Sequence, residues 1–240
     1  MPKEFINLQK AAEKTGMAPG DLRAIALQGD IPCFQRAEGM LFLEDDLDLW
    51  ISKNIVSGKD ARKTRRQHAS PGNAPKGLPL SELCPRQCIT CSLPGSSRAT
   101  IIRAITDLAD KSGFLYDPED LRREITRREE AGSTNIGNGI AIPHTMVREE
   151  GYFSETFICI AKLARPSYFN SAPDGSITEL LILSCCQDSA EHLNILARLS
   201  DICRLTDFME DVREAETDEG IYEALVKAEE QVARINRRGG

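Results

Sequence analysis

Hydrophobic and polar positions along the chain change their periodicity from segment to segment, and this predicts the helices and strands. Apolar residues recur at helical spacing over 8–15 and 19–27, with Gly16 after the first segment and Gly29 after the second. Two short apolar runs, 31–34 and 40–43, flank a turn at 37–39 and predict a small hairpin. The carboxylates at 44–46 then favour the start of a further helix, which continues through Trp50 and Ile51.

A second series of elements begins near Leu78 and alternates between strand and helix patterns. This alternation is typical of α/β proteins, so the sequence predicts a mixed-sheet α/β sandwich with helices on both faces. A small domain precedes it. The predicted strands of the sandwich are 88–93, 139–142, 153–163 and 178–186, and its predicted helices are 97–109, 118–128, 190–202, 206–212 and 217–232.

The stretch between the two series has no apolar periodicity and is rich in proline, glycine and charge. It predicts a flexible linker over 57–77, between a domain at 1–56 and a domain at 78–236. Charge supports this division. Residues 57–80 hold 6 basic and 1 acidic residues, a net charge of +5. Residues 1–56 hold 6 basic and 9 acidic residues (−3), and residues 81–240 hold 18 basic and 27 acidic residues (−9). The three net charges sum to −7. The basic run is either a solvated tether or an anion-contacting one.

Composition narrows the class of protein. No run of about 18 apolar residues is present, and the first residues lack the apolar core of a signal peptide, so we expect a cytoplasmic protein without membrane insertion. Its eight cysteines should then be mostly reduced. Cys84, Cys88 and Cys91 have a spacing that suits a metal, but no fourth thiolate is near. The favoured interpretation is that Cys88 and Cys91 line an apolar strand as small hydrophobic residues, and metal binding by the three cysteines stays open.

The most distinctive segment is 132–144, which reads GSTNIGNGIAIPH. Gly137 and Gly139 permit positive φ and close approach of another surface. A short buried strand follows, and Pro143 ends it. The imidazole of His144, one of only three in the chain, is thereby presented at the end of a strand. Such a histidine is either a hydrogen-bonded structural residue or a reactive one.

This segment resembles the active-site segment of enzyme IIA of the bacterial sugar phosphotransferase system, fructose/mannitol and nitrogen-regulatory type. The pattern of that family is close to G-S-T-G-I-G-N-G-[IV]-A-[IV]-P-H. Asn135 stands here in place of the usual glycine, and Thr145 follows the histidine where a smaller residue is common. Three further stretches resemble the family in the same order along the chain, namely Arg128-Glu129 before the motif, Phe169 to Gly175, and Glu191-His192-Leu193.

The resemblance implies a phosphocarrier, which has phosphotransferase activity through a phosphohistidine rather than acting as a classical enzyme. It implies that His144 accepts the phosphoryl group from an HPr-like phosphocarrier protein and passes it to a permease or a regulatory protein. A neutral imidazole supplies the required nucleophile near pH 7. No cofactor or metal is expected. His192 and Arg128 are expected to stabilise the phosphoryl group, with a surface helix position as the alternative for each. Ser133, Thr134 and Asn138 are the further candidate donors.

The N-terminal pattern resembles the winged helix-turn-helix of the excisionase and MerR type. Its second helix, 19–27, carries Arg23 as its only basic residue, whereas phosphate contacts supply most DNA affinity. Two function classes therefore compete. One is a phosphocarrier with a transcriptional or regulatory output, and the other is a non-catalytic binding module that contacts proteins rather than DNA. Contacts to DNA would come from Arg23, Arg36, Arg62, Lys63, Arg65 and Arg66.

Overall fold

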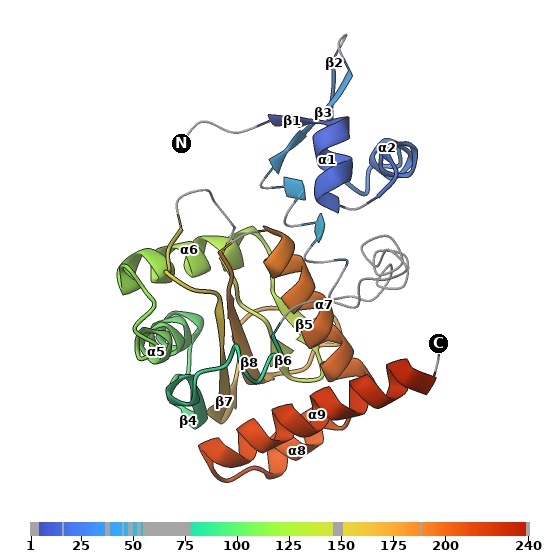
Figure 1. Cartoon of the computed structure of the whole chain (residues 1–240). Coiled ribbons are helices and arrows are strands. Elements are labelled where there is room, and N and C mark those ends of the chain that lie inside the picture. Colours follow the sequence, from blue (N-terminus) through green and yellow to red (C-terminus); the bar gives the residue numbers. More distant parts are fainter. Residues whose placement is uncertain are drawn as a thin grey trace. The chain divides into compact units, whose positions relative to one another are not determined.

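The chain divides into two compact units, residues 1–76 and 77–240 (Figure 1). The computed structural model describes residues 5–15, 17–36, 39–44, 46–47, 50–51, 54, 78–145, 151–187 and 189–238. The helix predicted from residue 44 onward falls partly outside these residues, and the predicted linker at 57–77 falls wholly outside them. The predicted boundaries of the domains and linker therefore stay predictions.

Among its described residues, the N-terminal unit contains helices α1 and α2 and a three-stranded antiparallel sheet in the order β1-β3-β2. Ile6 pairs with Phe42 in the sheet, and both side chains are buried. The two helices lie where the sequence predicted them. The first strand was not predicted, because a three-residue segment is too short to show a period and depends on its pairing with β3. The elements are β1 (Phe5–Asn7), α1 (Leu8–Thr15), α2 (Pro19–Leu27), β2 (Phe34–Arg36) and β3 (Gly39–Leu43).

The C-terminal unit is built on a mixed five-stranded sheet in the order β4-β7-β8-β6-β5. Strands β7 and β8 pair antiparallel at its centre, while β4 pairs parallel with β7 and β6 pairs parallel with β8. The predicted mixed sheet is confirmed. Its elements are η1 (Arg86–Cys88), β4 (Ile89–Leu93), α5 (Arg98–Asp110), α6 (Pro118–Ala131), β5 (Asn135–Gly137), β6 (Ile140–Ala141), β7 (Phe157–Ser167), β8 (Thr178–Cys185), α7 (Ser189–Leu205), α8 (Phe208–Glu214) and α9 (Asp218–Arg238).

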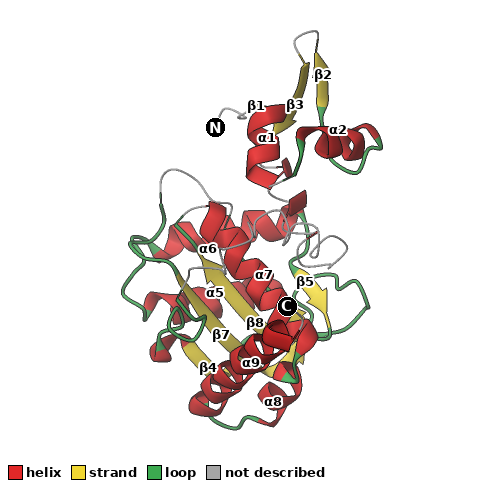
Figure 2. Cartoon of the chain, turned by 45° about the vertical axis from the view of Figure 1, so that its right-hand side comes forward, coloured by secondary structure: helices red, strands yellow, loops and turns green. Residues whose placement is uncertain are grey.

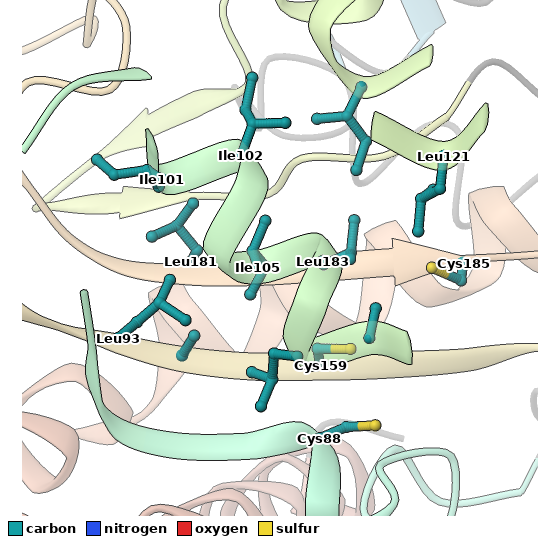
Figure 3. Close-up of a cluster of buried hydrophobic side chains, with 14 of the residues drawn as sticks. Cys88, Leu93, Ile101, Ile102, Ile105, Leu121, Cys159, Leu181, Leu183 and Cys185 are labelled. Atoms are coloured by element: carbon teal, nitrogen blue, oxygen red, sulfur yellow. The ribbon is translucent and has the colours of Figure 1, made fainter. Parts of the chain in front are cut away.

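Helices cover both faces of this sheet, with α5 and α6 on one side and α7 and α9 on the other (Figures 1 and 2). The central strands are therefore buried on both faces, which is why they read as continuous apolar runs. Between the sheet and α5, Ile101, Ile105 and Leu183 pack with the thiols of Cys88 and Cys159 (Figure 3). These two cysteines thus act as small apolar side chains in the core.

Local signals explain where the two helices on this face begin. Ser97 and Thr100 form a reciprocal capping box at the start of α5. Asp117 caps α6, and Pro118 occupies its first turn, where the missing N–H is harmless. Strand β7 differs from its prediction, since it begins at Phe157 rather than residue 153. Phe153 instead bridges to Leu115, so its apolar character reflects a packing position before the strand.

The hairpin that joins β5 to β6 has a two-residue loop, Asn138-Gly139, with φ of 51° and 76°. Positive φ at both loop residues is the type I′ geometry that Asn-Gly favours. A Cβ at Gly137 would lie 2.9 Å from a carboxylate oxygen of Asp174, so this glycine also allows close approach. The hairpin directs the chain back through β6 toward His144.

Candidate phosphoryl-acceptor site

His144 follows β6 at the point where the strand leaves the sheet. The carbonyl of Pro143 accepts a hydrogen bond from the Ser184 N–H at 3.0 Å, and His144 itself forms a parallel bridge with Ser184. Strand β8 therefore fixes the backbone at Pro143 and His144. The motif presents its imidazole at a strand end, as the sequence predicted, and the side chain is only 4% exposed.

The two ring nitrogens of His144 have different partners. Nδ1 lies 2.8 Å from the carbonyl oxygen of Ile142, and the Arg128 Nε–H donates to Nε2 at 3.1 Å. A carbonyl oxygen can only accept, so Nδ1 must carry the proton. An N–H donor to Nε2 likewise requires that Nε2 present its lone pair. Both contacts assign the same tautomer, in which Nε2 is the nucleophilic nitrogen.

The surroundings of His144 keep the ring neutral. Burial is the largest effect that holds its pKa well below the usual 6.5, and the nearby Arg128 and His192 lower it further. The Ile142 carbonyl opposes this shift but does not overcome it. The imidazole is therefore unprotonated at neutral pH, which is the state that attacks an electrophile.

His192 lies beside His144, although the two residues are far apart in sequence. It comes from the first turn of α7, and its ring centroid is 4.7 Å from that of His144 at an interplanar angle of 46°. Both rings are buried. The N-terminal end of a helix also favours negative charge nearby. The structure thus brings together the predicted acceptor and its predicted stabiliser.

Arg128 belongs to the last turn of α6 and is almost fully buried. Besides its bond to His144, its Nη1 donates to the carbonyl oxygen of Gly132 at 2.9 Å, just after the helix ends. A buried guanidinium needs such partners, since an unsatisfied charge is costly inside a protein. The site thus holds a cation within hydrogen-bonding distance of Nε2 of His144.

The segment from Gly132 to Thr134 is anchored to α6 by Glu129. The Glu129 carboxylate accepts hydrogen bonds from the hydroxyl and backbone N–H of Thr134. It also accepts one from the Asn170 amide at 2.8 Å. Burial raises the pKa of Glu129, while these donors and Arg128 act in the opposite direction. Ser133 is partly buried, and its hydroxyl accepts from the Asn135 N–H at 3.1 Å.

Asn138 is not brought to His144. Its backbone N–H donates to Asp174 at 2.7 Å, and its side-chain oxygen faces Arg213 at 3.4 Å. It precedes β6, whereas His144 follows it, and the extended chain from Ile140 to His144 alone spans roughly 13 Å at about 3.3 Å per residue. The tertiary contacts of Asn138 fix the tip of the hairpin. Sequence reasoning also missed Asn170 and Thr178, whose polar side chains join the buried groups behind the site.

The remaining candidates lie elsewhere in the chain. Arg23 and Arg36 are exposed on α2 and β2 of the N-terminal unit. The sulfur of Cys91 contacts the carbonyl of Glu216, while Cys84 and Cys88 are buried. No group of three histidine, cysteine or acidic residues among the described positions is placed to hold a metal ion. The four other candidate basic residues, Arg62, Lys63, Arg65 and Arg66, lie outside the described residues.

Within the described part of the chain, no helix combines the length and apolarity needed to cross a membrane.

Curated relatives match the C-terminal unit over most of their own length. The nitrogen regulatory protein of Pseudomonas aeruginosa is 31% identical over 137 residues, which cover 56% of this chain and 86% of that protein. The nitrogen regulatory protein of Escherichia coli K12 is 31% identical over 159 residues, which cover 63% and 92%. The fructose-specific EIIA component of Haloferax volcanii is 26% identical over 152 residues, which cover 63% and 97%.

Solved structures show the same fold. The crystal structure of the nitrogen regulatory protein IIA-Ntr from Neisseria meningitidis aligns with a TM-score of 0.54 at 22% identity, covering 61% of this chain and 98% of that chain. IIA mannitol from Escherichia coli aligns with a TM-score of 0.51 at 20% identity, covering 59% and 97%. The family model described as "Phosphoenolpyruvate-dependent sugar phosphotransferase system, EIIA 2" matches residues 82–228, more than half of the chain. The chain therefore belongs to the EIIA 2 family of the phosphoenolpyruvate-dependent sugar phosphotransferase system.

Proposed function

We propose that this protein is a regulatory phosphocarrier, which receives a phosphoryl group on Nε2 of His144 from an HPr-like donor protein. The observation that carries the proposal is the pair of contacts on one ring. The Ile142 carbonyl holds Nδ1–H, and Arg128 lies at 3.1 Å from the lone pair of Nε2. These two contacts support Nε2 as the nucleophilic atom and Arg128 as the cation that meets the incoming negative charge.

The transfer exchanges one nitrogen–phosphorus bond for another. The Nε2 lone pair attacks phosphorus while the donor's N–P bond breaks, and the donor nitrogen leaves with the bonding pair. The proton on Nδ1 stays hydrogen-bonded to Ile142. The Arg128 Nε–H points at the Nε2 lone pair, so during transfer this N–H must pass from Nε2 to a phosphoryl oxygen, while the Nη1 bond to Gly132 keeps the guanidinium beside the ring. His192 supplies a second group beside the reacting ring. Positioning and charge neutralisation therefore do most of the work.

The experiment is incubation with a phosphorylated HPr-type protein, followed by measurement of the intact mass. We expect one added phosphoryl group that is labile in acid and stable in base. His144→Ala should remove it, while His68→Ala should keep it. Full phosphorylation of His144→Ala would overturn the assignment of the acceptor.

We further propose that the N-terminal unit is the regulatory output, as a winged helix-turn-helix. The order of α1, α2 and the β2–β3 hairpin supports this proposal. If the unit binds DNA, the linker must supply most of the phosphate contacts, because α2 has Arg23 as its only basic residue. Binding should then be weak and strongly dependent on salt. Phosphorylation adds about −2 charge to an acidic domain, which would compete for the basic linker.

One observation favours protein contact as a second candidate function for this unit. Leu27 on α2 is 56% exposed, and Phe5 and Phe34 are 43% and 49% exposed. The rings of the two phenylalanines form an edge-to-face pair with centroids 5.3 Å apart. An exposed pair of apolar rings such as Phe5 and Phe34 is more typical of a protein contact than of a phosphate contact.

A titration of labelled genomic DNA fragments distinguishes DNA binding from protein contact. It uses phosphorylated and unphosphorylated protein at two salt concentrations. No binding at low salt would support the protein-contact function. Binding that is identical for both forms would refute the coupling to His144 but would keep the DNA function.

A further inference from the structure

A buried asparagine, Asn135, joins three segments behind the site. It lies in β5 and is 6% exposed. Its Nδ2 donates to the backbone carbonyl of Asn170 at 2.8 Å, and its Oδ1 accepts from the Thr178 hydroxyl at 2.9 Å. Both ends of one amide are therefore paired, one with the turn before Asp174 and the other with the start of β8. A satisfied buried amide of this kind fixes the separation of the segments that it connects.

The next member of this network reaches α6. The Asn170 side-chain amide donates to the backbone carbonyl of Glu129 at 2.9 Å and to its carboxylate at 2.8 Å. Glu129 directly follows Arg128 in the last helical turn. Carbonyl groups in that turn lack partners within the helix, so the Asn170 amide supplies one. Asn135 thus holds Asn170, and Asn170 holds the end of α6.

Arg128 depends on both parts that this network holds. Its Cα lies in the last turn of α6, and its Nη1 bonds to the carbonyl of Gly132, in the segment that Glu129 ties down through Thr134. A shift of either part would change the 3.1 Å contact between Arg128 Nε and His144 Nε2.

We infer that Asn135 is a positioning residue of this chain, which sets Arg128 against His144 through Asn170 and Glu129. The inference rests on the proposed phosphoryl transfer at His144. The related pattern has glycine at this position, which offers no side-chain amide, so the bridge is a feature of this chain's own sequence. Its consequence is an Arg128 already placed before the phosphoryl donor arrives, and such preorganisation speeds transfer without new contacts to the donor.

The main test replaces Asn135 with the glycine of the related pattern. Asn135→Gly should lower kcat for phosphoryl transfer by about tenfold with little change in KM, because the donor-binding surface is untouched. Thr178→Val removes only the hydroxyl that holds Oδ1 and should give a smaller fall, about threefold. Thr106→Val is the matched control. Its buried hydroxyl bonds to Ile102 within α5, and its loss should leave kcat unchanged.

Two readouts separate positioning from a loss of stability. The pKa of His144, followed by NMR, should rise toward its usual value in Asn135→Gly, because Arg128 lowers it in the native protein. In an Arg128→Ala background the same substitution should change kcat by less than about twofold, because the residue through which it acts is gone.

A tenfold fall that persists in the Arg128→Ala background would overturn the inference, as would an unchanged kcat and His144 pKa in Asn135→Gly. If Asn135→Gly does not fold, the comparison of Thr178→Val with Thr106→Val decides, and equal rates in those two variants would also overturn it. A wild-type protein that takes no phosphoryl group refutes the proposed function. The NMR measurement still tests the placement of Arg128 in that case.

Discussion

Replacement of Arg128 by alanine tests whether one buried cation carries most of the charge neutralisation at His144. The side chain is 3% exposed, and its Nε lies 3.1 Å from the reacting nitrogen. An incoming phosphoryl group brings about two negative charges, and loss of one preorganised donor in such a site costs about 2.7–4 kcal/mol in the transition state. We therefore expect kcat for transfer to fall by about 100–1,000-fold.

A second effect of the same substitution has to be separated from the first. Arg128 also lowers the pKa of His144, so its removal leaves a larger fraction of the ring protonated and unreactive at low pH. That part of the loss should disappear at pH 8, where the ring is neutral in either protein. The loss of charge neutralisation should remain. Rapid-quench measurements of transfer from a phosphorylated HPr-type donor at pH 6 and pH 8 distinguish the two.

The neighbouring arginine provides the matched control. Arg127 is 42% exposed and pairs with Glu124 at 2.8 Å on the surface of the same helix, an interaction worth about 0–1 kcal/mol. Arg127→Ala removes the same charge one residue away and should slow transfer by less than about twofold. Arg128→Lys should restore part of the rate, since it keeps the charge without the planar fork. Transfer by Arg128→Ala within about threefold of wild type at pH 8 would refute this reasoning.

Three further predictions follow from the described contacts. Between pH 7.5 and 5.5 the wild type should lose stability relative to His144→Gln, by at most about 1.4 kcal/mol, because the unfolded histidine gains a proton below 6.5 while the pKa of the buried ring lies well below that value. Denaturant titrations across this range check it, and parallel curves for the two proteins would contradict it. Asn138→Ala should transfer phosphate at a rate within about twofold of wild type, since its side chain faces Arg213. A fall in the transfer rate of Asn138→Ala by tenfold or more in the same assay would show that Asn138 does act at the site. Ile105→Ala should lower the unfolding free energy by about 2–5 kcal/mol, because the side chain is fully buried against the sheet. Chemical denaturation measures this, and a change below 1 kcal/mol would show that the core repacks.

The local patterns of the sequence were sufficient for most of the elements. Helical periodicity and capping residues located α1, α2, α5 and α6, because each signal lies within a few residues of the structure that it controls. The Gly-Asn-Gly sequence likewise indicated a turn before the strand that leads to His144, although the strand before that turn, β5, was not predicted. The family was identifiable for the same reason, since the segment 132–144 carries its pattern in consecutive residues.

The assembled site depended on contacts between residues that are distant in sequence. Nothing near His144 along the chain indicates that Nδ1 is held by Ile142, that Arg128 rather than Arg127 turns inward, or that Asn138 faces Arg213. The same holds for Asn135, whose amide is useful only where Asn170 and Thr178 lie within hydrogen-bonding distance. The residue type determines which hydrogen bonds a side chain can make, and the tertiary structure determines which of them form. Burial and the geometry of the partners exist only after the sheet and helices have packed.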